Sequence, residues 1–137
     1  IGANAAINPS SENVVDAILN LTSGKGVDLV FTACPILQTH KDAFKVIASN
    51  GAINLFGGIG KTEQPIEILS NYIHYKQISV TGSHGSTPSQ HRKALSLIQE
   101  GIITVDDIIS HEISLNNIIE GFNLAQSGEA SKVLIVN

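Results

Sequence analysis

The sequence contains no methionine and no tryptophan, and its single cysteine is Cys34. One cysteine cannot form an internal disulfide or a multi-thiolate zinc site, which excludes disulfide-rich secreted scaffolds and zinc fingers. Long apolar runs are absent too, because Val133–Val136 is far shorter than the ~20 residues that span a bilayer. No charged-then-apolar signal peptide opens the chain. We therefore expect a cytoplasmic protein with no membrane partner.

Basic residues are in the minority. The chain has 12 acidic and 8 basic side chains and a formal net charge of −4. Nucleic-acid-binding domains carry basic stripes that displace counterions, so we expect no nucleic-acid partner. Hydrophobic residues make up 42% of the 137 residues, which is enough for a core. At roughly 100–200 residues per domain, the length allows one domain and hardly two.

The absence of methionine also indicates that the sequence does not begin at a translation start. Translation normally begins with methionine, whereas this sequence begins Ile1-Gly2-Ala3. We interpret the chain as a piece of a longer polypeptide. A function inferred from it would then belong in part to a parent protein.

Helix and strand signals alternate along the first two thirds of the chain. Asn8 followed by Pro9 is typical of a helix N-terminus, and Gly24 suits the left-handed residue after that helix. The nearly continuous apolar run Val27–Thr32 indicates a strand buried on both faces, as in a parallel sheet. The next elements are a helix over about Pro35–Ala48, a strand Ala52–Phe56, a helix Ile66–Tyr75 and a strand Gln77–Thr81. This order predicts an α/β fold with parallel crossovers.

The last third departs from this alternation. Thr87-Pro88-Ser89-Gln90 is a capping box with proline at the first helical position, and its helix ends at Gly101. An extended segment at Ile108–Ile113 follows. A helix that begins at Ser114 and ends at Gly128, and a strand over Lys132–Val136, complete the chain.

Small residues follow three of the predicted strands. In an open parallel sheet, ligands bind beyond the carboxyl ends of the strands, and small residues let a flat ligand approach the backbone. We predict that the three strand ends line one crevice, although glycine after a strand can also simply serve a turn. The segments are Thr32-Ala33-Cys34, Phe56-Gly57-Gly58-Ile59 and Gly82-Ser83-His84. None of them matches a dinucleotide fingerprint or a phosphate loop.

Other reactive side chains give weaker signals. The five histidines have no familiar metal-ligand spacing. Three of them lie on predicted helices and suit a surface or half-buried packing role: His40, His74 and His91. His84 lies just past a predicted strand, so it is either a surface residue or a residue that contacts a cofactor. Cys34 is interpreted as a small packed residue, because no base lies beside it in the sequence. Lys132 is either a solvated residue or a cation for a phosphate group.

Four stretches occur in a recognisable order. They read GANAAINPSSENVVDAILNLTSGKGVDLVFTA, VIASNGAINLFGG, YKQISVTGS and EISLNNIIEGFNLAQSGEASKVLIVN. Together they resemble the C-terminal portion of a medium-chain dehydrogenase of the zinc-containing alcohol, polyol and threonine dehydrogenase branch. The resemblance implies a partial Rossmann fold, doubly wound and mainly parallel with flanking helices. Residues 1–105 would be an incomplete NAD(P)-binding domain, and residues 106–137 a segment returning to a catalytic domain outside this sequence.

The resemblance also implies cofactor contacts. The first strand end, with Thr32, Ala33 and Cys34, would line the adenosine side of NAD or NADP. The second, with Phe56, Gly57 and Ile59, would border the nicotinamide, and the third, with Gly82 and Ser83, would face the nicotinamide ribose. Lys132 would lie near the pyrophosphate. No catalytic residue or metal ligand is expected in this chain, because the family's glycine fingerprint and zinc ligands lie upstream of the matching stretch.

The activity implied for the parent is hydride transfer between the nicotinamide and a secondary alcohol, polyol or amino alcohol, with zinc as a Lewis acid. This chain alone would be inactive, and the parent would be a homo-oligomer. Two alternatives stay open: a zinc-free quinone or enone reductase of the same superfamily, and a non-enzymatic structural or interaction relative. An early cysteine followed by a His-Glu pair in the upstream sequence would favour zinc chemistry.

Missing strands would leave an exposed edge. In the Rossmann order 3-2-1-4-5-6, two strands lie between the third and the fourth. Without them, a strand at about Ala5–Ile7 would have no neighbour, and Val27–Thr32 would show an unpaired apolar edge. Such an edge is a template for association, so we expect this edge to pair with a second chain or the chain to be marginally stable.

The isolated chain is expected to bind NAD weakly or not at all, because the glycine fingerprint and the acidic residue for the adenosine ribose are missing from it. Calorimetric titration of the chain with NAD measures this directly. Micromolar affinity would contradict the expectation.

Overall fold

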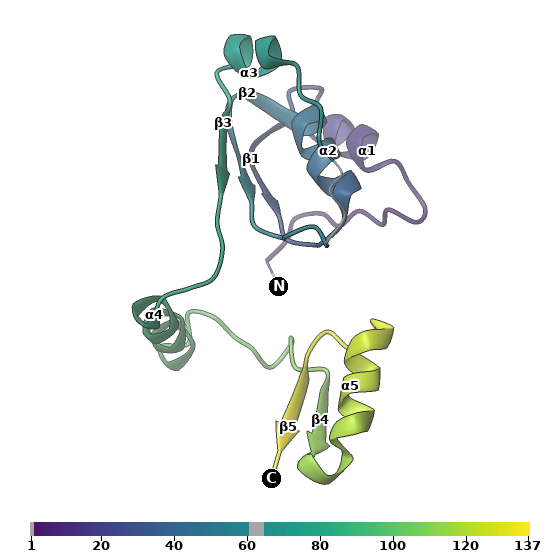
Figure 1. Cartoon of the computed structure of the whole chain (residues 1–137), viewed down its shortest axis with the longest axis vertical. Helices are drawn as coiled ribbons and strands as arrows, with labels where there is room; N and C mark the ends of the chain where they lie inside the picture. Colours follow the sequence, from purple (N-terminus) through teal and green to yellow (C-terminus); the bar gives the residue numbers. More distant parts are fainter. Residues whose placement is uncertain (1, 61–64) are drawn as a thin grey trace. The chain divides into compact units, whose positions relative to one another are not determined.

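Three parallel strands form the sheet of residues 3–85 in the computed structural model, which describes residues 2–60 and 65–137. The strands are β1 (Val27–Thr32), β2 (Ile47–Leu55) and β3 (Ser79–Gly82), in the order β1-β2-β3 (Figure 1). Both strand pairs are parallel. The predicted α/β class with a Rossmann-like parallel sheet is confirmed.

The two faces of this sheet differ. Val30, Ile53 and Val80 are in register across it, and the next row is Phe31, Asn54 and Thr81. Because side chains alternate between faces along a strand, these rows lie on opposite sides. Ile53 is fully buried, whereas Phe31 is 62% exposed. One face therefore carries the core, and the other is open in this part of the chain.

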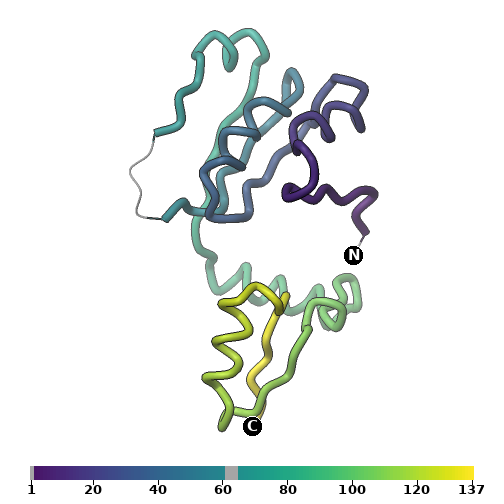
Figure 2. The backbone as a smooth tube through the Cα atoms, turned by 90° about the vertical axis from the view of Figure 1, so that its right-hand side faces the viewer, coloured from purple at the N-terminus to yellow at the C-terminus, as the bar shows by residue number. Residues whose placement is uncertain are grey.

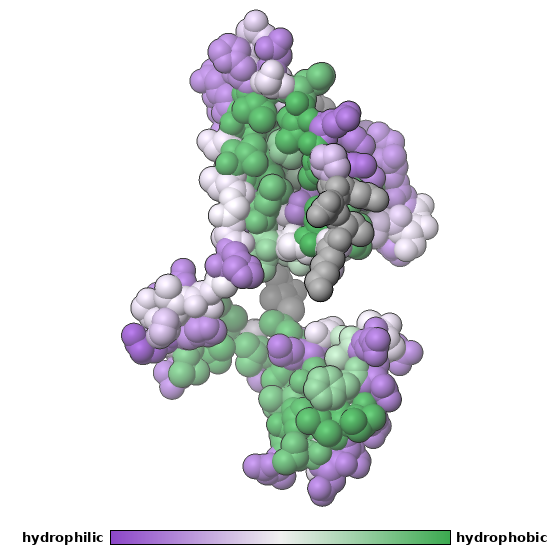
Figure 3. Space-filling view, in the orientation of Figure 1, coloured by the Kyte–Doolittle hydropathy of each residue, from purple (hydrophilic) through white to green (hydrophobic). Residues whose placement is uncertain are grey.

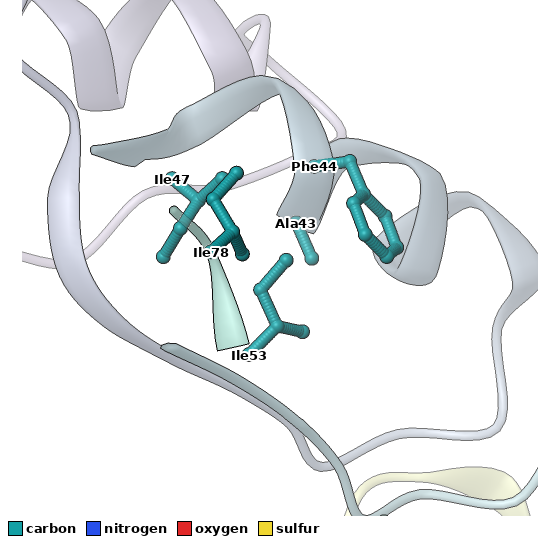
Figure 4. Packing of buried hydrophobic residues seen from close by; sticks show 5 residues of the cluster. All are labelled: Ala43, Phe44, Ile47, Ile53 and Ile78. Atoms are coloured by element: carbon teal, nitrogen blue, oxygen red, sulfur yellow. The ribbon is translucent and has the colours of Figure 1, made fainter. Parts of the chain in front are cut away.

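The core on the buried face is small. Helix α2 (Leu37–Val46) contributes Ala43 and Phe44, β2 contributes Ile47 and Ile53, and Ile78 precedes β3 (Figure 4). Helix α3 (Ser70–Lys76) adds Tyr72 and Ile73 at the margin. These contacts hold α2 against the sheet and thereby set its position relative to the strand ends.

Helix α1 (Val14–Leu21) begins later than predicted. Its N-cap is Asn13, whose side-chain oxygen accepts from the Asp16 N–H at 3.1 Å. Asn8 instead closes a turn, because its Oδ1 accepts from the Ser10 N–H at 3.0 Å. The predicted start at Asn8-Pro9 is therefore wrong: two asparagines are available as caps, and the later one is used. Gly24 does take the left-handed conformation, with φ of 77°.

The boundary between α2 and β2 also differs from the prediction. Extended backbone begins at Ile47, so the predicted helix to Ala48 is too long and the predicted strand from Ala52 too short. The register with β1 is irregular there, since Val27 pairs with Ile47 but Leu29 pairs with Ala52. Asn50 has a φ of 62° within this irregularity. Pairing with β1 has overridden the helical pattern of the sequence.

The strand expected at about 5–7 is not formed, and the described residues there are irregular. A single strand with no neighbour leaves its backbone groups unpaired, which explains its absence. The strand predicted at Gln77–Thr81 lies slightly later, as β3.

Residues 86–137 form a second compact unit, and the division falls after Gly85. Helix α4 (Pro88–Gln99) begins with the predicted capping box, and the Gly101 φ of 69° marks its end. Strands β4 (His111–Ser114) and β5 (Val133–Val136) are parallel. The short helix η1 (Leu115–Asn117) and helix α5 (Ile118–Ser127) connect them, and α5 lies along the pair (Figure 2). Within the described residues, no helix is long and apolar enough to cross a membrane.

Several large apolar side chains of this second unit are exposed. Ile119 and Phe122 on α5 are 69% and 66% exposed, and hydrophobic residues cover much of the visible surface of this unit (Figure 3). The pairing of β4 with β5 and the packing of α5 on both strands hold the unit together. Gly121 allows this close approach, because a Cβ there would lie 3.0 Å from Ile135 Cδ1.

Strand β1 is an edge of the three-stranded sheet. The Phe31→Lys substitution tests whether two copies of the chain associate through this edge. We expect the chain to self-associate through β1 or to be marginally stable, and Phe31→Lys to reduce any association because lysine disfavours edge pairing. Leu21→Lys on α1 is the matched control, since Leu21 and Phe31 are both 62% exposed. Sedimentation velocity measures the association. A stable monomer with well-protected amides over residues 27–32 would contradict the expectation.

Candidate functional site

The carboxyl ends of the three strands lie at one edge of the sheet. Thr32 is paired with Leu55, and Leu55 with Gly82. The parallel register therefore brings eight of the nine predicted cofactor residues to this edge, at or just beyond the strand ends. All eight are uncharged: Thr32, Ala33, Cys34, Phe56, Gly57, Ile59, Gly82 and Ser83. We call these eight residues the strand-end residues.

The turns after β1 and β2 lie against each other. The Gly57 N–H donates to the Thr32 carbonyl. A Cβ at Gly57 would lie 2.7 Å from both the N and the O of Cys34, so no side chain fits there without a backbone shift. Cys34 is partly buried, and its Sγ lies 3.5 Å from Thr39 Oγ1. The two turns thus form one tightly packed surface.

His40 on α2 holds the same turn from the other side. Its side chain is 4% exposed, and its Nε2 lies 3.0 Å from the Gly57 carbonyl oxygen. A surface or half-buried packing role was predicted for His40, whereas the structure buries it and adds a hydrogen bond that the sequence reasoning missed. A signal was present: His40 shares a helix face with Ala43 and Phe44, and a polar group on a buried face needs a partner.

Thr32 carries a buried polar atom without a partner. The residue is 3% exposed, and its Oγ1 is the one buried side-chain nitrogen or oxygen in the described residues that makes no hydrogen bond. Such a group is destabilising by about 1–3 kcal/mol. Thr32 lines a hollow of about 750 Å³ together with Ala33, Cys34 and residues of α1 and α2. An unused hydroxyl at a strand end suits a polar ligand in this crevice.

Asn54 on β2 fixes the end of β3. Its Nδ2 donates to Thr81 Oγ1 at 3.2 Å, and its Oδ1 accepts from Ser83 Oγ at 2.7 Å. The Ser83 N–H donates to the Leu55 carbonyl at 3.2 Å. Sequence reasoning missed Asn54, although a lone amide inside the apolar stretch Ala52–Phe56 was a usable signal. This network gives the Ser83 hydroxyl a defined position at the edge.

The ninth predicted residue belongs to the second unit. The Lys132 carbonyl oxygen accepts from the Ser110 N–H at 3.0 Å and from Ser110 Oγ at 3.1 Å. Its ammonium group has no hydrogen bond or ion pair with any residue in the described ranges. A contact between Lys132 and a pyrophosphate stays a prediction. His84 is exposed and also stays a prediction as a cofactor contact.

Charge contributes little to the strand-end site. The ion pair between Lys45 Nζ and Asp42 Oδ1, at 3.0 Å on α2, is the single salt bridge of the described residues. No group of three or more His, Cys, Asp or Glu side chains in residues 2–60 and 65–137 could hold a metal ion. The strand-end residues can bind and orient a ligand through backbone groups, hydroxyls and apolar surface. Charged side chains, among them Asp42 and Lys45, line the hollow beside Thr32.

A parallel sheet with flanking helices and a neutral edge of small residues defines a Rossmann-like α/β protein. The family described as zinc-binding dehydrogenase matches residues 1–100. The chain therefore belongs to the zinc-binding dehydrogenase family, and the resemblance drawn from the sequence is confirmed.

Individual relatives agree with this membership. The chain is 28% identical over 137 residues to a sorbitol dehydrogenase of Halalkalibacterium halodurans, covering 98% of the chain and 39% of that protein. It is 25% identical over 138 residues to an L-threonine 3-dehydrogenase of Bacillus velezensis, covering 99% and 39%. A crystal structure of a zinc-binding dehydrogenase from Sinorhizobium meliloti 1021 bound to NADP matches with a TM-score of 0.85 and 28% identity, covering 99% and 40%. The chain thus spans about two fifths of the length of these relatives.

The Gly57→Ala substitution tests the tight turn packing. We expect it to lower the free energy of unfolding by about 1–3 kcal/mol, because the added methyl overpacks the Cys34 backbone. Gly58→Ala is the matched control and should change stability by less than about 1 kcal/mol, since a Cβ there meets nothing within 4 Å. Urea unfolding followed by circular dichroism measures both. Equal effects of the two substitutions would contradict the packing described.

Proposed function

We propose that this chain forms the nicotinamide-side wall of the cofactor site in an NAD(P)-dependent oxidoreductase that acts on a secondary alcohol, polyol or amino alcohol. The observation that carries the proposal is the alignment of the eight strand-end residues along one edge of a parallel sheet. Ligands of open α/β sheets bind at this edge. The names of the sorbitol and threonine dehydrogenase relatives support the reaction class, and the NADP in the Sinorhizobium structure supports the cofactor.

The strand-end residues fit a nicotinamide dinucleotide in their chemistry. The Thr32 hydroxyl is buried and unpartnered, and the Ser83 hydroxyl is held in place by Asn54. Phe56 is 55% exposed and offers apolar surface to a flat ring. Glycine at position 57 lets the backbone of the two turns pack closely. In the proposal, Lys132 of the second unit faces the pyrophosphate.

The contribution of the chain to the reaction is orientation. Bound NAD(P) supplies or accepts the hydride, and the strand-end residues hold the nicotinamide at a fixed angle and exclude water from it. Because these residues are uncharged, any acid, base or metal that acts on the substrate belongs to other parts of the protein. In the proposal, the ligands of the family's zinc lie outside this sequence.

Further parts of the proposal concern organisation. Residues 1–105 are assigned to the cofactor-binding domain and residues 106–137 to a segment that returns to a separate catalytic domain. The complete protein is assigned as a cytoplasmic homo-oligomer that acts on a small alcohol.

Titration of isotopically labelled chain with millimolar NADH and NADPH tests the cofactor assignment. We expect amide resonances of the strand-end residues to shift, and Phe56→Ala to weaken binding by about fivefold, because an aromatic contact contributes roughly 1 kcal/mol. Phe122→Ala on α5 is the matched control, since Phe122 is 66% exposed and lies in the other unit. The proposal fails if a dinucleotide binds the unmodified chain without shifting the strand-end amides, or if both substitutions weaken binding equally.

A further inference from the structure

His40 is a buried ionisable residue that the proposed function leaves unused. Of the five histidines, all within the described residues, His40 alone is buried. It lies on the face of α2 that contacts the sheet, in the same helix as the core residues Ala43 and Phe44. Its Nε2 is 3.0 Å from the Gly57 carbonyl oxygen. A carbonyl oxygen only accepts hydrogen bonds, so Nε2 must carry the proton and donate.

This hydrogen bond completes the restraint of Gly57. The Gly57 N–H is already bonded to the Thr32 carbonyl, and its Cα lies against the backbone of Cys34. Both polar backbone groups of Gly57 are therefore paired, one from β1 and one from α2. The orientation of the peptide group that joins Gly57 to Gly58 follows from these contacts.

The planarity of that peptide group relates the direction of the Gly57 carbonyl to that of the Gly58 N–H. The bond is trans, as are all peptide bonds of the described residues, so its C=O and N–H point in opposite directions. With the Gly57 oxygen directed at His40, the Gly58 N–H points away from α2. Gly58 is exposed, a Cβ on it would meet nothing within 4 Å, and its N–H has no partner in residues 2–60 and 65–137.

We propose that His40 is a positioning residue, which fixes the Gly57–Gly58 peptide group so that the Gly58 N–H is presented as a hydrogen-bond donor to the carboxamide oxygen of nicotinamide. This inference rests on the proposed function, because it takes nicotinamide as the ligand of the second strand end. The donor is a backbone group held before the ligand arrives, so no reorganisation is needed on binding. His40 itself does not touch the cofactor.

Two substitutions of His40 separate this role from simple packing. Glutamine carries an N–H donor at the same number of bonds from Cα as the histidine Nε2, whereas methionine has similar length and no donor. The titrated probes are reduced nicotinamide mononucleotide for one half of the cofactor and AMP for the other. Amide spectra of the labelled full chain report binding and folding together.

In the unmodified chain, we expect the imidazole ¹⁵N spectrum to show a protonated Nε2 and the mononucleotide to shift the Gly58 amide. His40→Met should weaken mononucleotide binding by about tenfold, the factor typical of one lost hydrogen bond. It should leave AMP binding within about twofold. His40→Gln should restore mononucleotide binding to within about threefold of the unmodified chain.

The possible failures are distinguishable. An unprotonated Nε2 would overturn the positioning role, and this readout needs no variant, so it holds even where His40→Met does not fold. The positioning role is also overturned if His40→Met binds the mononucleotide as well as the unmodified chain does, or if it loses AMP binding to the same extent as mononucleotide binding. It is overturned as well if His40→Gln does not restore mononucleotide binding. If NADH or the mononucleotide binds the unmodified chain but shifts no strand-end amide, the proposed function fails, and the inference falls with it.

Discussion

The parallel pairing of β2 with both of its neighbours is the constraint on which the candidate site depends. It places Thr32, Leu55 and Gly82 side by side. The turns that follow the three strands therefore start from one edge of the sheet. The buried Ile53 ties the same strand to α2, so the helix that carries His40 is held by the strand whose end it restrains. A slip of one residue in this register would reverse the two faces of β2 and would separate the turns.

The edge that results is neutral and built largely from backbone. Gly57 is held by Thr32, Cys34 and His40, and Ser83 is held by Asn54. Such contacts fix the backbone at the ends of β1, β2 and β3. The parallel sheet that carries these ends agrees with membership of the zinc-binding dehydrogenase family.

Prediction from sequence succeeded where the signal is local. The capping box at Thr87, the left-handed Gly24 and the helix ends at Gly101 and Gly128 are all found in the structure, because each depends on a few neighbouring residues. Prediction failed where a distant partner decides the outcome. Ile47 follows the helical pattern of α2 but forms a strand, since Val27 pairs with it. The family resemblance implied a strand at about 5–7, but these residues are irregular in the structure.

The sequence by itself determined the α/β class, the small residues after each strand and the family resemblance, because apolar periodicity, turn chemistry and motif order are properties of the chain in one dimension. Only the tertiary structure decided that the strand-end residues share one edge, that Asn54 spans two strands and that His40 donates to Gly57. His40 and Gly57 are 17 residues apart, and no local pattern records which carbonyl a buried imidazole will reach. That choice is made by the packing of α2 on the sheet.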